Sequence, residues 1–191
     1  MLLGYKSQKE YFQWGNMSNL SKIIVCALYF SCVANAAYAH RSTVEQIGDY
    51  LQLLVPAYAF GMAMNEPDWD GVKQFAYSYG TTTAAVYALK YTVHERRPNK
   101  ANNHSFPSGH TASAMSGATF IHKRYGLDRA IIPYLMTGFT AFARVDANKH
   151  WWWDTAAGAA IAGLVTWNMV DRYENVAFSA TPNSVRVNVK F

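Results

Sequence analysis

The chain has 191 residues, of which 51% are hydrophobic and 15% are charged, and this length fits one domain with a sizeable core. The formal net charge of +5 suits an anionic substrate or a membrane surface, but no basic run with interleaved aromatic residues indicates a nucleic-acid-binding protein. The charged fraction is low for a soluble protein, whereas the mean hydropathy of -0.10 is low for a chain that lies mostly in lipid.

Residues 1–39 have the pattern of a secretory signal. Lys22 precedes an apolar run over residues 23–33, and Ala37-Tyr38-Ala39 forms a small-x-small cleavage site before His40. In the alternative interpretation, residues 23–39 are retained as a first transmembrane helix. In both interpretations, His40 lies on the outer side of the membrane.

Two further features depend on how the N-terminal segment is processed. Met17 is an alternative start, which would make residues 1–16 an upstream extension. Cleavage after Ala39 would remove both cysteines, Cys26 and Cys32, and leave a mature chain with no thiol and no disulfide.

Residues 40–174 are expected to form a single all-α domain. Five segments are predicted as helices, over residues 44–65, 71–93, 109–125, 129–143 and 151–173. Each contains an uncharged stretch of about 12 to 16 residues, shorter than the roughly 20 of a full membrane span. With the N-terminal segment, the sequence therefore predicts a bundle of five to six helices.

The tail over residues 175–191 has a different pattern. Apolar and polar residues alternate over residues 185–191, residues 181–184 form a turn, and residues 175–179 can supply a partner strand. We expect a short β-hairpin or strand that packs on the helices, on another copy or at a membrane. A frayed tail is the alternative.

The first of three polar stretches ends the second predicted helix of the domain. Lys90 and Arg97 are seven residues apart, so both side chains can project from one face at a helix end, and Pro98 then forces the chain out of the helix. An ammonium and a planar guanidinium bind one phosphate in complementary ways. A single such pair is typical of surface charges that complement a helix dipole.

The second stretch, Pro107-Ser108-Gly109-His110, predicts a turn that opens a helix. Ser108 has the residue type of an N-cap, and Gly109 lets backbone N–H groups approach an anion at the helix N-terminus. His110 would face the same anion and can protonate a leaving oxygen. Alone, these residues would indicate an ordinary helix cap.

The third stretch contains His150 and Asp154, four residues apart and on one helix face. A carboxylate there accepts from one ring nitrogen and leaves the other as a nucleophile, and Arg144 adds a third cation. An isolated His–Asp pair at this spacing is commonly a surface pair with no catalytic role. Together, the three stretches supply the cations, anion-binding turn, nucleophile and acid that phosphoryl transfer needs.

The order and spacing of these residues resemble the type 2 phosphatidic acid phosphatase (PAP2) superfamily. Its signature is Lys-x6-Arg-Pro, then Pro-Ser-Gly-His, then Ser-Arg-x5-His-x3-Asp. The matching positions are Lys90, Arg97, Pro98, residues 107–110, Arg144, His150 and Asp154. The resemblance implies a PAP2-like helical bundle, and the helices on either side of the motifs are consistent with it.

The resemblance also implies a role for each matched residue. His150 would attack phosphorus and form a phosphohistidine, Asp154 would orient it, and His110 would protonate the leaving group. The phosphoryl oxygens would be held by Lys90, Arg97, Ser108, Gly109 and Arg144. Neither a metal nor a cofactor is implied, because cations and backbone donors stabilise the charge on the phosphoryl group.

Members of the family act on lipid phosphates, diphosphates or small phosphoesters. We therefore expect a phosphatase whose substrate is a phosphorylated lipid, such as phosphatidate, phosphatidylglycerol phosphate, a polyprenyl diphosphate or lipid A. A soluble periplasmic acid phosphatase of broad specificity and a non-catalytic lipid-binding membrane protein remain as alternatives. The oligomeric state is open.

The predicted location follows from the exported His40. If the helices alternate across a bilayer, all three motifs fall on the outer face, which predicts a bacterial inner-membrane protein with its site facing the periplasm. A soluble periplasmic protein is the alternative.

Two departures from the family pattern bear on the site. Ala143 replaces the serine before the arginine, which removes one hydroxyl donor, and only residues 99–106 separate the first two motifs. Asn102, Asn103 and His104 in this short loop either contact a headgroup or are solvated. Residues 151–153, three tryptophans, either lie at a membrane interface or pack in the core.

Overall fold

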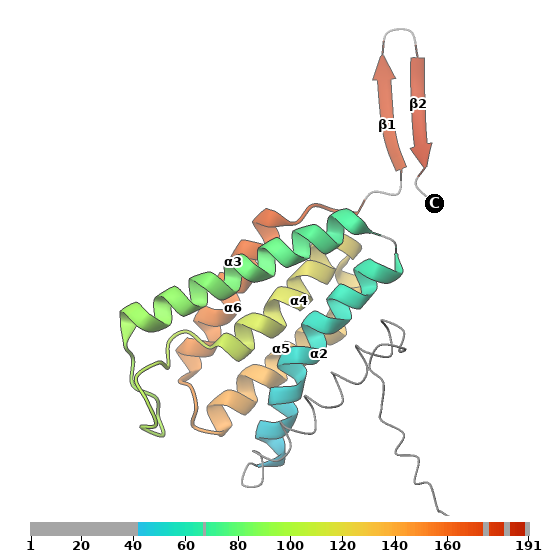
Figure 1. Cartoon of the computed structure of the whole chain (residues 1–191). Helices are drawn as coiled ribbons and strands as arrows, with labels where there is room; N and C mark the ends of the chain where they lie inside the picture. Colours follow the sequence, from blue (N-terminus) through green and yellow to red (C-terminus); the bar gives the residue numbers. More distant parts are fainter. Residues whose placement is uncertain (1–41, 67, 174–175, 182–183, 190–191) are drawn as a thin grey trace, which may run out of the picture. The chain divides into compact units, whose positions relative to one another are not determined.

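The computed structural model describes residues 42–66, 68–173, 176–181 and 184–189, so the predicted signal or first helix lies outside the described residues. The helices are α2 (Thr43–Asn65), α3 (Trp69–Val93), α4 (Gly109–Tyr125), α5 (Leu127–Asp146) and α6 (Trp152–Met169) (Figure 1). These are the five helices predicted within residues 40–174, which confirms the helical fold of this region. A sixth helix stays a prediction.

Helix α4 lies at the centre of the bundle and contacts α2, α3, α5 and α6 (Figure 1). A Cβ at Gly117 would lie 2.8 Å from the backbone of Pro56, so this glycine lets α2 approach α4 closely. Phe120 and Ile121, both fully buried, pack with Phe75 of α3 in one core cluster. The N-terminus of α4 is therefore fixed in the middle of one end of the bundle.

Helix α3 begins at Trp69, two residues earlier than predicted, because Asp68 caps it. Its carboxylate accepts a hydrogen bond from the N–H of Gly71 at 2.9 Å. The buried guanidinium of Arg124 donates two further hydrogen bonds to this carboxylate, and the hydroxyl of Tyr125 donates another. This network ties α3 to the C-terminal end of α4, opposite the Pro-Ser-Gly-His turn.

Helix α6 ends at Met169, so the predicted helical end at Tyr173 is wrong. The N–H of Asp171 donates to the side-chain carbonyl of Gln74 at 2.9 Å, and the N–H of Tyr173 donates to the carbonyl of Arg124 at 2.9 Å. These partners on α3 and α4 replace the carbonyl groups four residues earlier that a continuing helix would use.

The tail contains two paired strands, β1 (Val176–Thr181) and β2 (Ser184–Val189). They run antiparallel, with Val176 opposite Val189 and Thr181 opposite Ser184. The predicted packing of this tail as a half-buried hairpin stays a prediction.

Candidate active site

A cavity of about 550 Å³ opens where α3 ends and α4 begins. It is lined by residues of α2, α3 and α4 and of the loops that follow α3 and α5. Five of the eight predicted site residues line it, namely Lys90, Arg97, Gly109, His110 and His150. The fold thus brings residues of all three motifs to one cavity.

His150 lies in the turn before α6, and its side chain is 2% exposed. Its Nδ1 lies 3.4 Å from Oδ2 of Asp154, which leaves Nε2 as the nitrogen available to a ligand. Burial lowers the pKa of His150 to about 4, although the neighbouring Asp154 acts in the opposite direction. The imidazole is therefore neutral at physiological pH, as a nucleophile must be.

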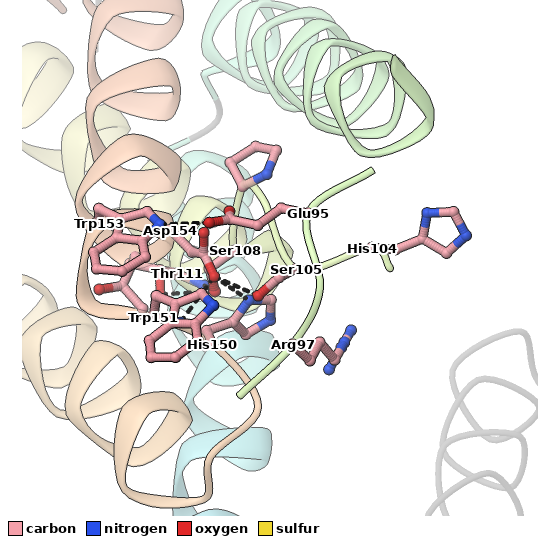
Figure 2. A network of polar contacts seen from close by, with 12 residues as sticks. Glu95, Arg97, His104, Ser105, Ser108, Thr111, His150, Trp151, Trp153 and Asp154 are labelled. Atoms are coloured by element: carbon pink, nitrogen blue, oxygen red, sulfur yellow. Dashed lines mark hydrogen bonds and ion pairs between the residues drawn. The ribbon is translucent and has the colours of Figure 1, made fainter. Parts of the chain in front are cut away.

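Asp154, in the first turn of α6, is fully buried and accepts hydrogen bonds from two other residues. Its Oδ2 accepts from the hydroxyl of Ser105 at 2.5 Å and from the N–H of Trp151 at 2.8 Å; Figure 2 shows Ser105 and His150 grouped around this carboxylate. Burial favours the neutral acid, but the neighbouring His150 and the hydrogen bond from Ser105 prevail and lower the pKa of Asp154 to about 2. Asp154 is therefore ionised beside His150.

Ser105 and Glu95 match no signature position of the three motifs, but both contact residues of the third one. The N–H of Ser105 donates to the carbonyl of Glu95 at 2.9 Å, and the Glu95 carboxylate accepts from the indole N–H of Trp153 at 2.8 Å. Burial and the neighbouring Asp154 raise the pKa of Glu95. No local spacing marks these residues, because their partners lie 49 and 58 positions away.

The Pro-Ser-Gly-His turn begins α4 as predicted. The hydroxyl of Ser108 accepts from the N–H of Thr111 at 3.4 Å and so caps the helix, and the N–H of Ser108 donates to the carbonyl of Asp154 at 2.9 Å. Helix α6 approaches so closely that a Cβ at Gly158 would overlap the carbonyl oxygen of Ser108. The contacts of Ser108 and Gly109 with a phosphate stay predictions.

Lys90 and Arg97 supply the cations of the cavity. The ammonium of Lys90 donates to the carbonyl of Pro107 at 2.6 Å and to that of His104 at 3.1 Å. Burial lowers the pKa of Lys90 to about 8, and the charge of Arg97 adds to this effect. The Nε of Arg97 donates to Oδ1 of Asn102 at 2.9 Å. The short loop between the motifs therefore holds both cations at the cavity.

His110 and Arg144 converge on Asp49 of α2, a buried residue that the sequence analysis did not single out. Oδ1 of Asp49 accepts from Nη1 of Arg144 at 2.5 Å and lies 3.1 Å from Nε2 of His110. Burial lowers the pKa of His110, against the effect of the Asp49 hydrogen bond. Arg144 is buried, bonded to Asp49 and absent from the cavity lining, so its contact with phosphate stays a prediction.

Ala143, which replaces the serine of the family pattern, is fully buried. A Cβ at Gly48 would lie 2.5 Å from the Cβ of Ala143, so this position belongs to the contact between α2 and α5. It does not line the cavity. The alanine therefore removes no hydroxyl from the cavity wall.

The three tryptophans lie on the surface beside the site and are 37%, 67% and 39% exposed in chain order, which excludes the core-packing alternative. The rings of Trp151 and Trp153 stack with their centroids 5.1 Å apart. The indole N–H of Trp151 donates to the carbonyl of Arg96 at 3.0 Å. Trp151 and Trp153 thus attach the loop after α3 to the start of α6 (Figure 2).

The chemistry available in the cavity is that of cations, a neutral imidazole and an ionised carboxylate. Among the described residues, no group of three or more His, Cys, Asp and Glu side chains could hold a metal ion. Two fixed cations suit a doubly charged ligand such as a phosphate group.

The chain is similar to known proteins of one family. A family model described as the PAP2 superfamily matches residues 71–177. The chain is 39% identical over 83 residues to a lipid A 1-phosphatase of Porphyromonas gingivalis, a match that covers 42% of this chain and 19% of that protein. It is 29% identical over 135 residues to a lipid A 4′-phosphatase of Helicobacter pylori, covering 65% of this chain and 66% of that protein. The chain thus spans less than two thirds of either relative.

The fold is also similar to that of a solved structure. The crystal structure of Aquifex aeolicus LpxE superposes with a TM-score of 0.56 at 22% identity, covering 69% of this chain and 87% of that chain. This likeness establishes a shared fold. Because the family model covers more than half of the chain and includes all eight predicted site residues, the chain belongs to the PAP2 superfamily.

Proposed function

We propose that this protein is a phosphatase that hydrolyses the phosphate group of a lipid through a phosphohistidine on His150. The observation that carries the proposal is that buried, neutral His150 lines the same cavity as Lys90, Arg97 and His110. A phosphate bound there would meet two cations and a nucleophile that is already deprotonated. Preorganised charge of this kind is usually the largest contribution to catalysis.

In the first step, Nε2 of His150 attacks phosphorus and the P–O bond to the lipid breaks, while His110 gives its proton to the leaving oxygen. The imidazole becomes positively charged and keeps its Nδ1–H directed at the ionised Asp154. In the second step, water attacks the phosphohistidine, His110 takes the proton from this water, and inorganic phosphate leaves. Lys90, Arg97 and N–H groups at the start of α4 stabilise the phosphoryl oxygens, which requires no metal ion.

The choice of a lipid substrate is supported by the names of the two relatives, both of which are lipid A phosphatases. A phosphorylated lipid is therefore the proposed substrate class, with lipid A as the first candidate. Phosphatidate, phosphatidylglycerol phosphate and polyprenyl diphosphate are the candidates to compare with it.

The surface of the helices supports membrane association. In the described part of the chain, none of the helices is both long enough and apolar enough to cross a membrane. On α5, however, Leu127, Ile131, Ile132 and Leu135 are 52–69% exposed, whereas buried positions of the same helix include threonines. Exposed apolar side chains gathered in this way indicate contact with a membrane or partner. We propose that the protein associates with the bacterial inner membrane, with its site facing the periplasm.

Phosphate release by the purified full-length protein tests the proposed activity. We expect release from lipid A or another lipid phosphate in the presence of a chelator, and a loss of about a thousandfold or more for His150→Ala. His94→Asn is the control, because His94 is exposed and its φ of 53° is one that asparagine tolerates. Full activity of His150→Ala would show that the proposed nucleophile is wrong.

Cell fractionation tests the proposed location separately. We expect the protein in the membrane fraction and its extraction by detergent. Release by osmotic shock without detergent would contradict membrane association and favour the soluble acid phosphatase.

A further inference from the structure

The cavity continues beyond the phosphate-binding end towards Thr82 of α3 and Ser116 of α4, which also line it. Thr82 lies eight residues before Lys90, and Ser116 lies six residues after His110. At a rise of 1.5 Å per residue, these spacings correspond to about 9 to 12 Å along the helices. The cavity therefore has a second end about 10 Å from the phosphate-binding end.

Two hydroxyl groups at this second end lack hydrogen-bond partners. The side chains of Thr82 and Ser116 are 2% and 0% exposed, and within the described part of the chain neither Oγ1 of Thr82 nor Oγ of Ser116 has a hydrogen-bond partner. A buried hydroxyl without a partner is unfavourable and uncommon in folded proteins. The burial of these two unpaired hydroxyls therefore needs an explanation.

Several other helical hydroxyls in this protein find partners on their own helix. Thr83, next to Thr82, donates to the carbonyl of Tyr79 at 2.8 Å, and Thr137 donates to the carbonyl of Pro133 at 2.9 Å. Such bonds to the preceding turn are the common solution for Ser and Thr in helices. Thr82 differs from its neighbour in lining the cavity while its hydroxyl remains unpaired.

More polar groups surround the same end. The hydroxyls of Tyr79 and Ser113 lie 2.8 Å apart, and Ser113 donates to the carbonyl of Gln52 at 2.8 Å. All three residues line the cavity. A plain hydrocarbon chain would leave the hydroxyls of Thr82 and Ser116 unpaired, whereas a hydroxyl or amide group can both donate and accept.

We infer that this end is a subsite for the leaving group of the substrate, and that it binds a hydroxyl or amide group about 10 Å from phosphorus. The inference deepens the proposed function, on which it rests for the nature of the phosphate-binding end. It assigns Thr82 and Ser116 as the residues that select such lipids over plain hydrocarbon phosphates. A site built to hydrogen-bond a polar group rejects an analogue that lacks it, because its own buried groups are then left unpaired.

Binding of two matched phosphonates to the full-length protein in detergent tests the subsite. Both are non-hydrolysable and of equal length, but one is a plain alkyl phosphonate and the other carries an amide about 10 Å from phosphorus. By calorimetry, we expect the amide compound to bind the wild type about tenfold more tightly. Thr82→Val and Ser116→Ala should each reduce this preference. Equal affinities for the wild type, or a preference that survives both substitutions, would overturn the inference.

Thr166 of α6 provides a matched control. Its hydroxyl is also buried and has no partner among the residues that the structure describes, but it does not line the cavity. Thr166→Val should therefore keep the preference for the amide compound. Loss of the preference in this variant would show that the effect is not specific to the cavity.

Thermal stability supplies a readout that does not depend on a ligand. Valine has the shape of threonine without the hydroxyl, so Thr82→Val and Thr166→Val should each raise the melting temperature by about 2–4 °C. A lower melting temperature for Thr82→Val would mean that its hydroxyl has a partner in the free protein, which would contradict the inference.

Hydrolysis of the corresponding phosphate esters separates the two proposals. No phosphate release from either ester, with the binding preference retained, would contradict the proposed function and leave the subsite supported. Release from both esters at equal efficiency, without a binding preference, would contradict the subsite alone.

Discussion

The hydroxyl of Ser105 donates a 2.5 Å hydrogen bond to the carboxylate of Asp154, and both side chains are fully buried. This bond joins the loop before α4 to the first turn of α6. The carboxylate that faces His150 is thereby fixed relative to the turn that begins α4. The geometry of the proposed nucleophile thus depends on a residue outside the three motifs.

Ser105→Ala should lower kcat by about tenfold to a hundredfold, because the hydrogen bond that it removes is made to a charged group. The pKa of His150 should rise, because Asp154 loses a competing donor and attracts the imidazolium more strongly. As the pH falls, an imidazole with a raised pKa becomes protonated, and so inactive as a nucleophile, at a higher pH. The acid limb of kcat/KM should therefore move to higher pH. The measurement is the pH profile of kcat/KM.

Ser78→Ala is the control for this experiment. Ser78 is also fully buried, and its hydroxyl donates to the carbonyl of Phe75 on its own helix. This variant should keep the acid limb of the wild type. An unshifted acid limb in Ser105→Ala would show that Ser105 does not position Asp154.

The sequence predicted the five helices well because their signals are local. Ser108 is an N-cap next to the helix that it begins. Lys90 lies in the last turn of α3, which ends at Val93 rather than at Pro98, and Arg97 lies in the loop that follows. The order of the helices then brings the three motifs to one end of the bundle. Five of the residues that the resemblance singles out line one cavity.

The contacts that the sequence did not reveal are all long-range. Asp49 and Ser105 are 95 and 49 residues from Arg144 and Asp154, and no periodic pattern marks a partner at such a distance. The end of α6 was missed for the same reason, since Gln74 of α3 and Arg124 of α4 bind the backbone there. Packing, which local propensity cannot anticipate, decides these positions.

The activity of the wild type should have an acidic optimum. His150 is neutral above its pKa of about 4, whereas His110 is charged only below its own pKa, which burial lowers from 6.5. Attack needs the first group neutral and the second charged, so kcat/KM should be bell-shaped with its maximum between these values. A rate that is constant from pH 5 to pH 8 would contradict this assignment of nucleophile and acid.

Asp49→Asn should move the alkaline limb of the profile to lower pH. Without the negative charge of Asp49, the pKa of His110 falls further, so the protonated acid is lost sooner as the pH rises. The buried guanidinium of Arg144 also loses an ionic partner, which should lower the free energy of unfolding by about 3 kcal/mol. Enzyme kinetics across pH and urea denaturation measure the two effects.

Asp70→Asn is the matched control for Asp49→Asn. Asp70 forms an exposed ion pair with Lys73 at 3.3 Å, and such pairs contribute little to stability. Neither the alkaline limb nor the urea midpoint should change appreciably. An unchanged alkaline limb in Asp49→Asn would show that Asp49 does not set the charge of His110.

Gly158→Ala should displace the turn at Ser108, because the added Cβ would overlap its carbonyl oxygen. We expect a lower kcat/KM and a loss of about 1–3 kcal/mol in the free energy of unfolding. Gly163→Ala, on the same helix with nothing within 4 Å of the added Cβ, should instead stabilise the protein by about 0.5–1 kcal/mol. Equal behaviour of the two variants in denaturation and kinetics would refute the close contact.

The most direct test of the central claim is to trap the phosphoenzyme. The full-length protein is mixed with a ³²P-labelled lipid phosphate, denatured within one turnover at alkaline pH and digested, and the labelled peptide is identified. We predict that the label is on His150 and that His150→Ala carries none, while His94→Asn is labelled like the wild type. Label on another residue, or normal turnover with no labelled protein at any time point, would contradict nucleophilic attack by His150.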